Sequence, residues 1–121
     1  PAVFGLEMYQ SLRDSKVTLN SHIDISPKSA SNMRLFEATG VGTCLLTDWK
    51  ENIHELFEPE KEVITYRTAE ECVEKAKWLL EHPEEREKIA KAGQARCLRD
   101  HTFYRRAFVL DEIIKKEIAR V

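Results

Sequence analysis

The sequence lacks long hydrophobic runs and any large excess of one charge. No apolar stretch approaches the ~20 residues of a membrane-spanning helix, and no charged and then apolar leader begins the chain. The 19 basic and 21 acidic residues give a net charge of -2, which argues against an electrostatic nucleic-acid binder. We therefore expect a cytoplasmic protein with no membrane span and no nucleic-acid partner.

Cysteine and histidine are few and are not spaced as metal ligands. Cys44, Cys72 and Cys97 are odd in number and far apart, and each lies within an apolar pattern. The four histidines form no H-x-x-x-H pair. Because zinc sites favour close pairs such as C-x-x-C, we expect reduced thiols packed in the core and no metal site.

Several nucleotide-binding and hydrolytic signatures are also missing. The sequence has no P-loop, no G-x-G-x-x-G and no Ser/His/Asp order. The glycine motif at residues 40–42 follows a helical pattern and does not open one. It therefore indicates the end of a helix and the entry to a strand, not a phosphate cradle.

Apolar periodicity predicts alternating helices and strands in a single domain of residues 1–121. Strands are expected at residues 16–20, 43–47 and 62–66, and helices at 1–15, 33–40, 48–57 and 68–82, with two more that begin at residues 83 and 102. Alternation of this kind implies a parallel sheet with right-handed crossovers. The expected fold class is α/β, a partial doubly wound, Rossmann-like sheet of about three strands with flanking helices.

Three strands are few for a fold of this class. A complete nucleotide-binding unit has two βαβ halves, and its ligand crevice lies where the strand order reverses between them. We interpret the chain as one half, either excised from a longer protein or encoded as a short gene product. Strand 17–20 or strand 43–46 would then have an exposed edge that favours self-association.

Helix caps and apolar stripes predict which faces pack inward. Residues 68–71, Thr-Ala-Glu-Glu, form a capping box, and Pro83 suits the first turn of the next helix. The residues expected inward on these two helices are Cys72, Val73, Ala76, Leu79, Leu80, Ile89, Ala92 or Gly93, and Cys97. The last helix carries a stripe that we expect to be core, formed by Phe103, Ala107, Leu110, Ile114 and Ile118.

The candidate site centres on residues 29–48. Small polar residues open this segment, a short amphipathic helix carries Glu37, Gly40 ends that helix, and a buried strand follows. In a parallel α/β sheet, this arrangement places Glu37 beside the ligand crevice. On periodicity alone, a solvated helix glutamate is the simpler interpretation.

Three motifs together carry a family resemblance. They are Asn-Met-Arg-Leu-Phe-Glu-Ala-Thr-Gly-Val-Gly at residues 32–42, Leu-Phe-Glu-Pro at 56–59 and Ile-Ala-Lys-Ala-Gly at 89–93. The sequence resembles, over residues 3–106, the nucleotide-sugar-binding segment of group 1 GT-B glycosyltransferases, in the subgroup that includes spore maturation proteins of the CgeB type. The resemblance implies the second half of a GT-B C-terminal domain, without the acceptor-binding domain.

The resemblance also implies roles for individual residues. Glu37 would accept hydrogen bonds from the ribose hydroxyls of the donor, because a carboxylate offers several lone pairs. The backbone at Ser29, Ala30, Ser31, Asn32 and Met33 would contact the diphosphate or the sugar, while Ser29 or Ser31 also suits an ordinary helix cap. Ser29 stands where the family has a first glutamate, so the sugar contact departs from the family pattern.

Three further residues complete the candidate set. Arg34 is placed either to reach a phosphate or to form a salt bridge, and the sequence favours neither. Asn20 and His22 follow a predicted strand, at the end where open parallel sheets bind ligands. For His22, a loop-anchoring role is the simpler account and a catalytic role is the alternative.

Two functions follow from these expectations. The first is the nucleotide-sugar-binding part of a glycosyltransferase that moves a hexosyl group from a nucleoside diphosphate sugar to an acceptor, inactive as an isolated chain. By the resemblance, it needs no metal and no cofactor besides its donor substrate. The alternative is a non-catalytic interaction or regulatory module that kept the fold, which Ser29 in place of an acid favours.

Overall fold

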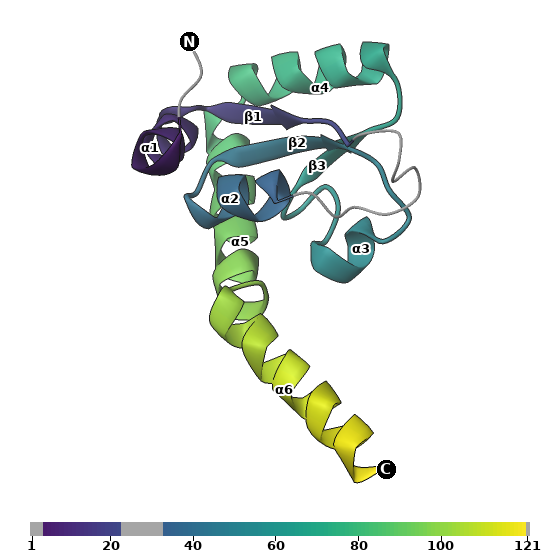
Figure 1. Cartoon of the computed structure of the whole chain (residues 1–121). Coiled ribbons are helices and arrows are strands. Elements are labelled where there is room, and N and C mark those ends of the chain that lie inside the picture. The colour runs from purple at the N-terminus through teal and green to yellow at the C-terminus, as the bar shows by residue number, and fades with distance from the viewer. Residues whose placement is uncertain (1–3, 23–32, 121) are drawn as a thin grey trace.

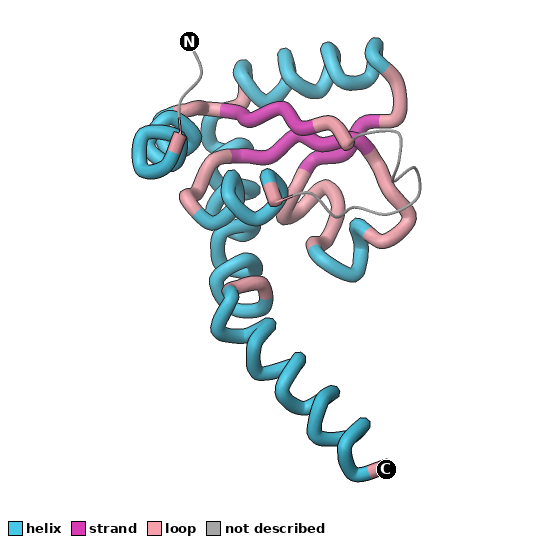
Figure 2. Tube along the Cα trace, viewed as in Figure 1, coloured by secondary structure: helices cyan, strands magenta, loops and turns pink. Residues whose placement is uncertain are grey.

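The computed structural model describes residues 4–22 and 33–120, which form an α/β domain with a long helical extension (Figure 1). The parallel sheet has the order β1-β2-β3, formed by β1 (Val17–Asn20), β2 (Cys44–Asp48) and β3 (Ile64–Tyr66). Val17 lies opposite Cys44 and Asn20 opposite Thr47. Figure 2 shows the three strands side by side with helices around them, which confirms the predicted fold class.

Six helices form within the described ranges. They are α1 (Gly5–Asp14), α2 (Arg34–Gly40), α3 (Ile53–Leu56), α4 (Ala69–Glu81), α5 (Pro83–Asp100) and α6 (Phe103–Ala119). Helices α2 and α3 lie on one face of the sheet and α4 on the other, and α5 packs against both β2 and α2 (Figure 1). Cover on both faces explains why the central strand is apolar at consecutive positions.

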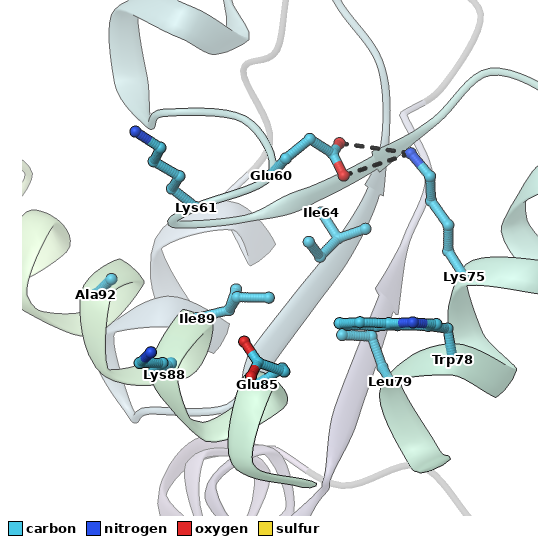
Figure 3. Close-up of a pocket in the computed structure, with 10 residues that line it drawn as sticks. All are labelled: Glu60, Lys61, Ile64, Lys75, Trp78, Leu79, Glu85, Lys88, Ile89 and Ala92. Atoms are coloured by element: carbon cyan, nitrogen blue, oxygen red, sulfur yellow. Dashed lines mark hydrogen bonds and ion pairs between the residues drawn. The ribbon is translucent and has the colours of Figure 1, made fainter. Parts of the chain in front are cut away.

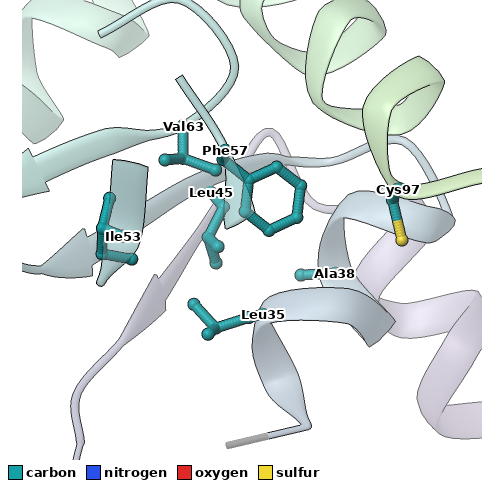
Figure 4. Packing of buried hydrophobic residues seen from close by; sticks show 7 residues of the cluster. All are labelled: Leu35, Ala38, Leu45, Ile53, Phe57, Val63 and Cys97. Carbon is teal, nitrogen blue, oxygen red and sulfur yellow. The ribbon is translucent and has the colours of Figure 1, made fainter. Parts of the chain in front are cut away.

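Alternate residues of β2 enter two separate hydrophobic clusters. Leu45 packs on the α2 side, in a cluster completed by Leu35, Ala38, Ile53, Phe57, Val63 and Cys97 (Figure 4). Cys44 and Leu46 pack on the α4 side, with Ile64, Leu79, Ile89 and Ala90. Helix α5 contributes to both clusters, so it packs against the hydrophobic layers on both faces of the sheet.

The link from α2 to β2 is a Schellman motif centred on Gly42. The N–H of Gly42 donates to the Thr39 carbonyl oxygen (3.1 Å) and that of Thr43 to the Ala38 carbonyl oxygen (3.3 Å). Helix α2 ends at Gly40 as predicted, but Gly42 is the residue with the positive φ, +87°. The residue that allows the chain to turn out of the helix is therefore Gly42, two positions later than the sequence pattern indicated.

Half of the predicted capping box of α4 is present at residues 68–71, because Thr68 caps the helix while the Glu71 side chain turns to Lys75. Thr68 Oγ1 accepts a hydrogen bond from the Glu71 N–H (3.1 Å), and the Glu71 carboxylate pairs with Lys75 (3.0 Å). Two residues predicted to face inward on this helix are exposed, namely Val73 at 53% and Leu80 at 55%, whereas Leu79 is fully buried. The sheet is covered by a narrower face of α4 than the apolar pattern suggested.

The last helix does not contribute to the core. Helix α6 projects away from the sheet (Figure 1), and none of its residues is buried by the part of the chain that the structure describes. The prediction of a core stripe at Phe103, Leu110, Ile114 and their neighbours was therefore wrong, because periodicity identifies an apolar face without showing what covers it. No described helix, α6 included, is both long and apolar enough to span a membrane.

The strand order also corrects the expectation for sheet edges. β2 pairs with β1 on one side and β3 on the other, so the strand at residues 43–46 has no exposed edge. Within the described residues, β1 pairs only with β2. Strand β1 is therefore an edge strand here, as one of the two predicted alternatives proposed.

Candidate functional site

The carboxyl ends of the three strands meet at one edge of the sheet. Asn20, Asp48 and Tyr66 are the last residues of β1, β2 and β3. Because the strands are parallel, these residues share the edge at which open α/β sheets bind ligands. A polar network and a cleft that contains Glu37 both lie at this edge.

Hydrogen bonds join the strand ends across the sheet. The Tyr66 hydroxyl donates to the Asn20 carbonyl oxygen (2.8 Å), and Asn20 Nδ2 donates to Thr47 Oγ1 (3.0 Å). Further back, Thr18 Oγ1 donates to Thr43 Oγ1 (3.3 Å). These side chains are largely buried, and their mutual hydrogen bonds offset the cost of removing polar groups from water.

His22 and Asp48 form a close pair beside this network. His22 Nδ1 lies 2.6 Å from Asp48 Oδ1, and the backbone N–H of His22 donates to both carboxylate oxygens at 3.1 Å. The His22 side chain is 2% exposed and that of Asp48 is 19% exposed. Asp48 therefore fixes both the ring and the backbone of His22, just beyond the end of β1.

The surroundings of Asp48 lower its pKa. Burial raises the pKa of this carboxyl, but the hydrogen bonds from the ring and the backbone of His22, together with electrostatic interactions with His22 and Lys50, lower it by more in sum. Lys50 Nζ lies 3.7 Å from Asp48 Oδ2. The charged form of Asp48 is thus favoured in the folded protein.

We expect Asp48 to contribute to stability above its ordinary carboxyl pKa and to lose this contribution in acid. Since the folded-state pKa is lowered from 3.8, protonation of Asp48 opposes folding as the pH falls through the lowered value. In Asp48→Asn, the loss in free energy of unfolding should be largest near pH 7 and should shrink toward about pH 3. Chemical denaturation at a series of pH values measures this difference.

Asp14→Asn is the matched control for this series. The Asp14 side chain is 72% exposed, and within the described part of the chain its ion pair is with the neighbouring, exposed Arg13. Its replacement should change stability little at any pH. A loss in Asp48→Asn that is independent of pH would show that shape, and not charge, accounts for the effect.

Glu37 lies in a cleft at the end of β1. The cleft has a volume of about 420 Å³ and is lined by Leu19, Asn20, Ser21, Met33, Arg34 and Glu37. Glu37 comes from the first turn of α2, and its side chain is 17% exposed. Arg34, three residues earlier, places its Nε 3.7 Å from Glu37 Oε1. The carboxylate lies outside both hydrophobic clusters and near the carboxyl end of β1.

The structure brings together part of the predicted site. Asn20, Met33, Arg34 and Glu37 all line the cleft, whereas His22 is held by Asp48 beside it. Ser29, Ala30, Ser31 and Asn32 lie outside the described residues. Sequence reasoning missed Thr47, Asp48 and Tyr66, although a carboxylate directly after a buried strand was a signal that could have indicated Asp48.

Other cavities are larger than this cleft, and two of them differ in their position relative to the candidate site. One of about 650 Å³ opens between the start of β3, α4 and α5, with an apolar floor that includes Trp78, Leu79 and Ile89 (Figure 3). No predicted site residue lines it. Another, of about 510 Å³, lies between α1, α2 and the junction of α5 with α6, and it shares Met33 and Glu37 with the cleft.

Among the described residues, no group of three or more His, Cys, Asp or Glu side chains is placed to hold a metal ion. Cys44 and Cys97 are buried free thiols, and Cys72 is partly buried. Burial raises the pKa of Cys44 to about 11, against the opposing charge of Arg86, so this thiol stays protonated at neutral pH.

Comparison with known proteins identifies the family of this chain. A family model described as glycosyl transferase-like matches residues 1–112. A search of curated proteins and of solved structures found no match. The matched range contains the whole sheet, the cleft at Glu37 and the His22–Asp48 pair. The chain therefore belongs to the glycosyl transferase-like family.

Proposed function

We propose that this chain is the nucleotide-sugar-binding part of a GT-B glycosyltransferase of the CgeB-like subgroup. It would bind a nucleoside diphosphate sugar, from which a hexosyl group passes to an acceptor. The family match supports glycosyl transfer, and the motif at residues 32–42 supports the donor-binding half. The position of Glu37 in the cleft at the end of β1 is the observation that carries the proposal.

A carboxylate in this position is suited to bind the ribose of the donor. Its two oxygens provide several lone pairs, so two neighbouring hydroxyls can both donate to it. Because the Glu37 side chain is only 17% exposed, water competes weakly for these hydrogen bonds. A cleft of about 420 Å³ is also within the range of small-molecule sites.

Arg34 supplies the cation of the same cleft. Its Nε is 3.7 Å from Glu37 Oε1, and its Nη2 lies 3.8 Å from the sulfur of Met8. The 3.7 Å separation is longer than a hydrogen bond, and 40% of the Arg34 side chain is exposed. The guanidinium can therefore turn toward a diphosphate without breaking a strong interaction.

The GT-B proposal predicts what pairs with the outer edge of β1. A strand of the other half would pair along this edge, and the donor would then lie between the two halves beside Glu37. Self-association through the same edge is the alternative when that half is absent. Under this proposal, the isolated chain binds a donor but does not turn it over.

Replacement of Glu37 by alanine tests the proposal. Isothermal titration calorimetry of the 121-residue chain with the diphosphates of uridine, guanosine and adenosine measures donor binding. Glu37→Ala should weaken the strongest interaction at least tenfold, because hydrogen bonds to a charged acceptor contribute about 1.5–3 kcal/mol. Glu74→Ala, at an exposed position of α4, should bind as the wild type does.

Equal affinity of Glu37→Ala and the wild type would remove Glu37 from the ribose role. No heat with any diphosphate in the wild type would count against donor binding by this chain. A second function, a non-catalytic module with the same fold, is favoured by Ser29 in place of the first family glutamate. Codons upstream of Pro1 that encode another α/β half support the enzyme, whereas a natural start directly before Pro1 supports the module.

A further inference from the structure

The His22–Asp48 pair leaves one ring nitrogen available. An ionised Asp48 carries no proton, so its close contact with Nδ1 requires Nδ1 to carry the hydrogen and donate it. In the neutral imidazole, Nε2 then holds a lone pair and acts as an acceptor. A carboxylate that fixes a histidine tautomer in this way is a common supporting arrangement in binding and catalytic sites.

Nε2 of His22 is buried and has no hydrogen-bond partner among the described residues. The whole side chain is 2% exposed, so bulk water does not solvate this nitrogen freely. A buried acceptor without a partner is unfavourable, and such groups are rare in folded proteins. The described part of the chain thus holds an acceptor in a fixed orientation without supplying its donor.

The location of this acceptor connects it to the proposed donor site. His22 directly follows Asn20 and Ser21, which line the cleft with Glu37. Asp48 ends the central strand, at the edge where the carboxyl ends of all three strands meet. The ligand proposed for this edge carries several hydroxyl groups, which are the kind of donor that a neutral imidazole accepts.

We propose that Asp48 is a positioning residue of the donor site, which holds His22 so that Nε2 accepts a hydrogen bond from a hydroxyl of the bound nucleoside diphosphate sugar. This inference rests on the proposed function and adds a second acceptor to Glu37. Asp48 does not touch the ligand and acts through His22. If His22 only anchored the loop, its contact with Asp48 would matter but a hydrogen bond at Nε2 would not.

His22→Asn separates the two roles. The asparagine amide nitrogen lies near the position of Nδ1 and can still donate to Asp48, but nothing replaces Nε2. We expect the variant to keep its thermal midpoint while its affinity falls about tenfold, as for the loss of one hydrogen bond. His54→Asn, at an exposed position of α3, is the matched control and should bind as the wild type does.

Calorimetry with two pairs of probes identifies the hydroxyl. The pairs are uridine diphosphate with uridine diphosphate glucose, and guanosine diphosphate with guanosine diphosphate mannose. If His22→Asn weakens the binding of a diphosphate that carries no sugar, the hydroxyl belongs to the ribose. If it weakens only the binding of the sugar conjugate, the hydroxyl belongs to the hexose. Both results support the proposal.

A double-mutant cycle tests whether Asp48 acts through His22. Asp48→Asn should weaken binding several-fold in the wild type and cause no further loss in His22→Asn. Nitrogen-15 spectra of the imidazoles provide a readout that does not depend on ligand. They should show His22 with its proton on Nδ1 in the wild type, and Nε2 should shift when the probe binds.

The possible failures are distinguishable. If the wild type binds a probe and His22→Asn binds it equally well, the inference is overturned and the proposed function stands. A proton found on Nε2, or a loss from Asp48→Asn that persists in full in His22→Asn, also overturns it. If the wild type binds no probe, the proposed function fails and this inference fails with it.

Discussion

Gly93→Ala should unfold or severely destabilise the protein, with a loss of about 3 kcal/mol or more in the free energy of unfolding. Gly93 is buried in α5, where the helix crosses the chain just before β3. A methyl group on Gly93 would overlap the carbonyl oxygen of Glu62, which is backbone and cannot move aside like a side chain. Helix propensity alone predicts the opposite sign, since alanine is better than glycine by about 1 kcal/mol within a helix.

The sign of the change in the free energy of unfolding therefore shows whether the clash with Glu62 or helix propensity dominates. Urea unfolding measures this change. Gly40→Ala is the matched control, because a methyl group there would meet only Cys97 Sγ, at an ordinary 3.6 Å. This control should change stability by less than about 1 kcal/mol. A stabilised Gly93→Ala would show that α5 does not approach the Glu62 backbone as closely as the structure places it.

Phe57→Ala should cost about 3–5 kcal/mol of stability, because it removes the largest side chain of a core cluster and leaves a cavity. Phe57 is 0% exposed and packs with Leu45, Val63 and their neighbours between α2, α3 and the sheet (Figure 4). Its ring centroid also lies 5.1 Å from that of His101 and 6.2 Å from that of Phe36. Collapse around so many contacts would be incomplete, so a large loss is expected.

Phe103→Ala is the control for Phe57→Ala, because it makes the same substitution at an exposed position. Phe103 begins α6 and is 81% exposed, so its replacement should alter stability by less than about 0.5 kcal/mol. Thermal and urea unfolding of both variants would test the contrast. Similar losses in the two variants would mean that α6 is covered in solution and that Phe103 belongs to a buried contact.

The elements of the fold were predictable because their signals are local. The apolar run at β2, the cap at Thr68 and the proline at residue 83 each depend on a few neighbouring residues. The exposed stripe of α6 was not predictable, because burial depends on a surface supplied by another part of the molecule. The prediction for the turn after α2 was off by two positions, because the sequence does not distinguish Gly40 from Gly42. The hydrogen bonds to the Ala38 and Thr39 carbonyl oxygens and the positive φ identify Gly42 as the turn residue.

The candidate site was predictable in part for a similar reason. Glu37 and Asn20 were identified from motif and strand position, and the parallel topology brings them to one cleft. Asp48 was missed because its importance comes from His22, which lies just beyond the end of the neighbouring strand β1. No spacing along the chain shows that the backbone N–H of His22 meets this carboxylate. A contact between two residues that lie 26 positions apart in the sequence forms only when the sheet is assembled.

The polar pairs between the two strands have a consequence for the alignment of the sheet. If β1 slipped by two residues along β2, the same side chains would still face each layer, so hydrophobic burial alone would oppose the slip only weakly. A slip in either direction would, however, separate Asn20 from Thr47 and His22 from Asp48. Buried polar groups would then lose their partners in two places at once. These pairs therefore fix the register of β1 against β2, and with it the position of the β1 residues that line the cleft.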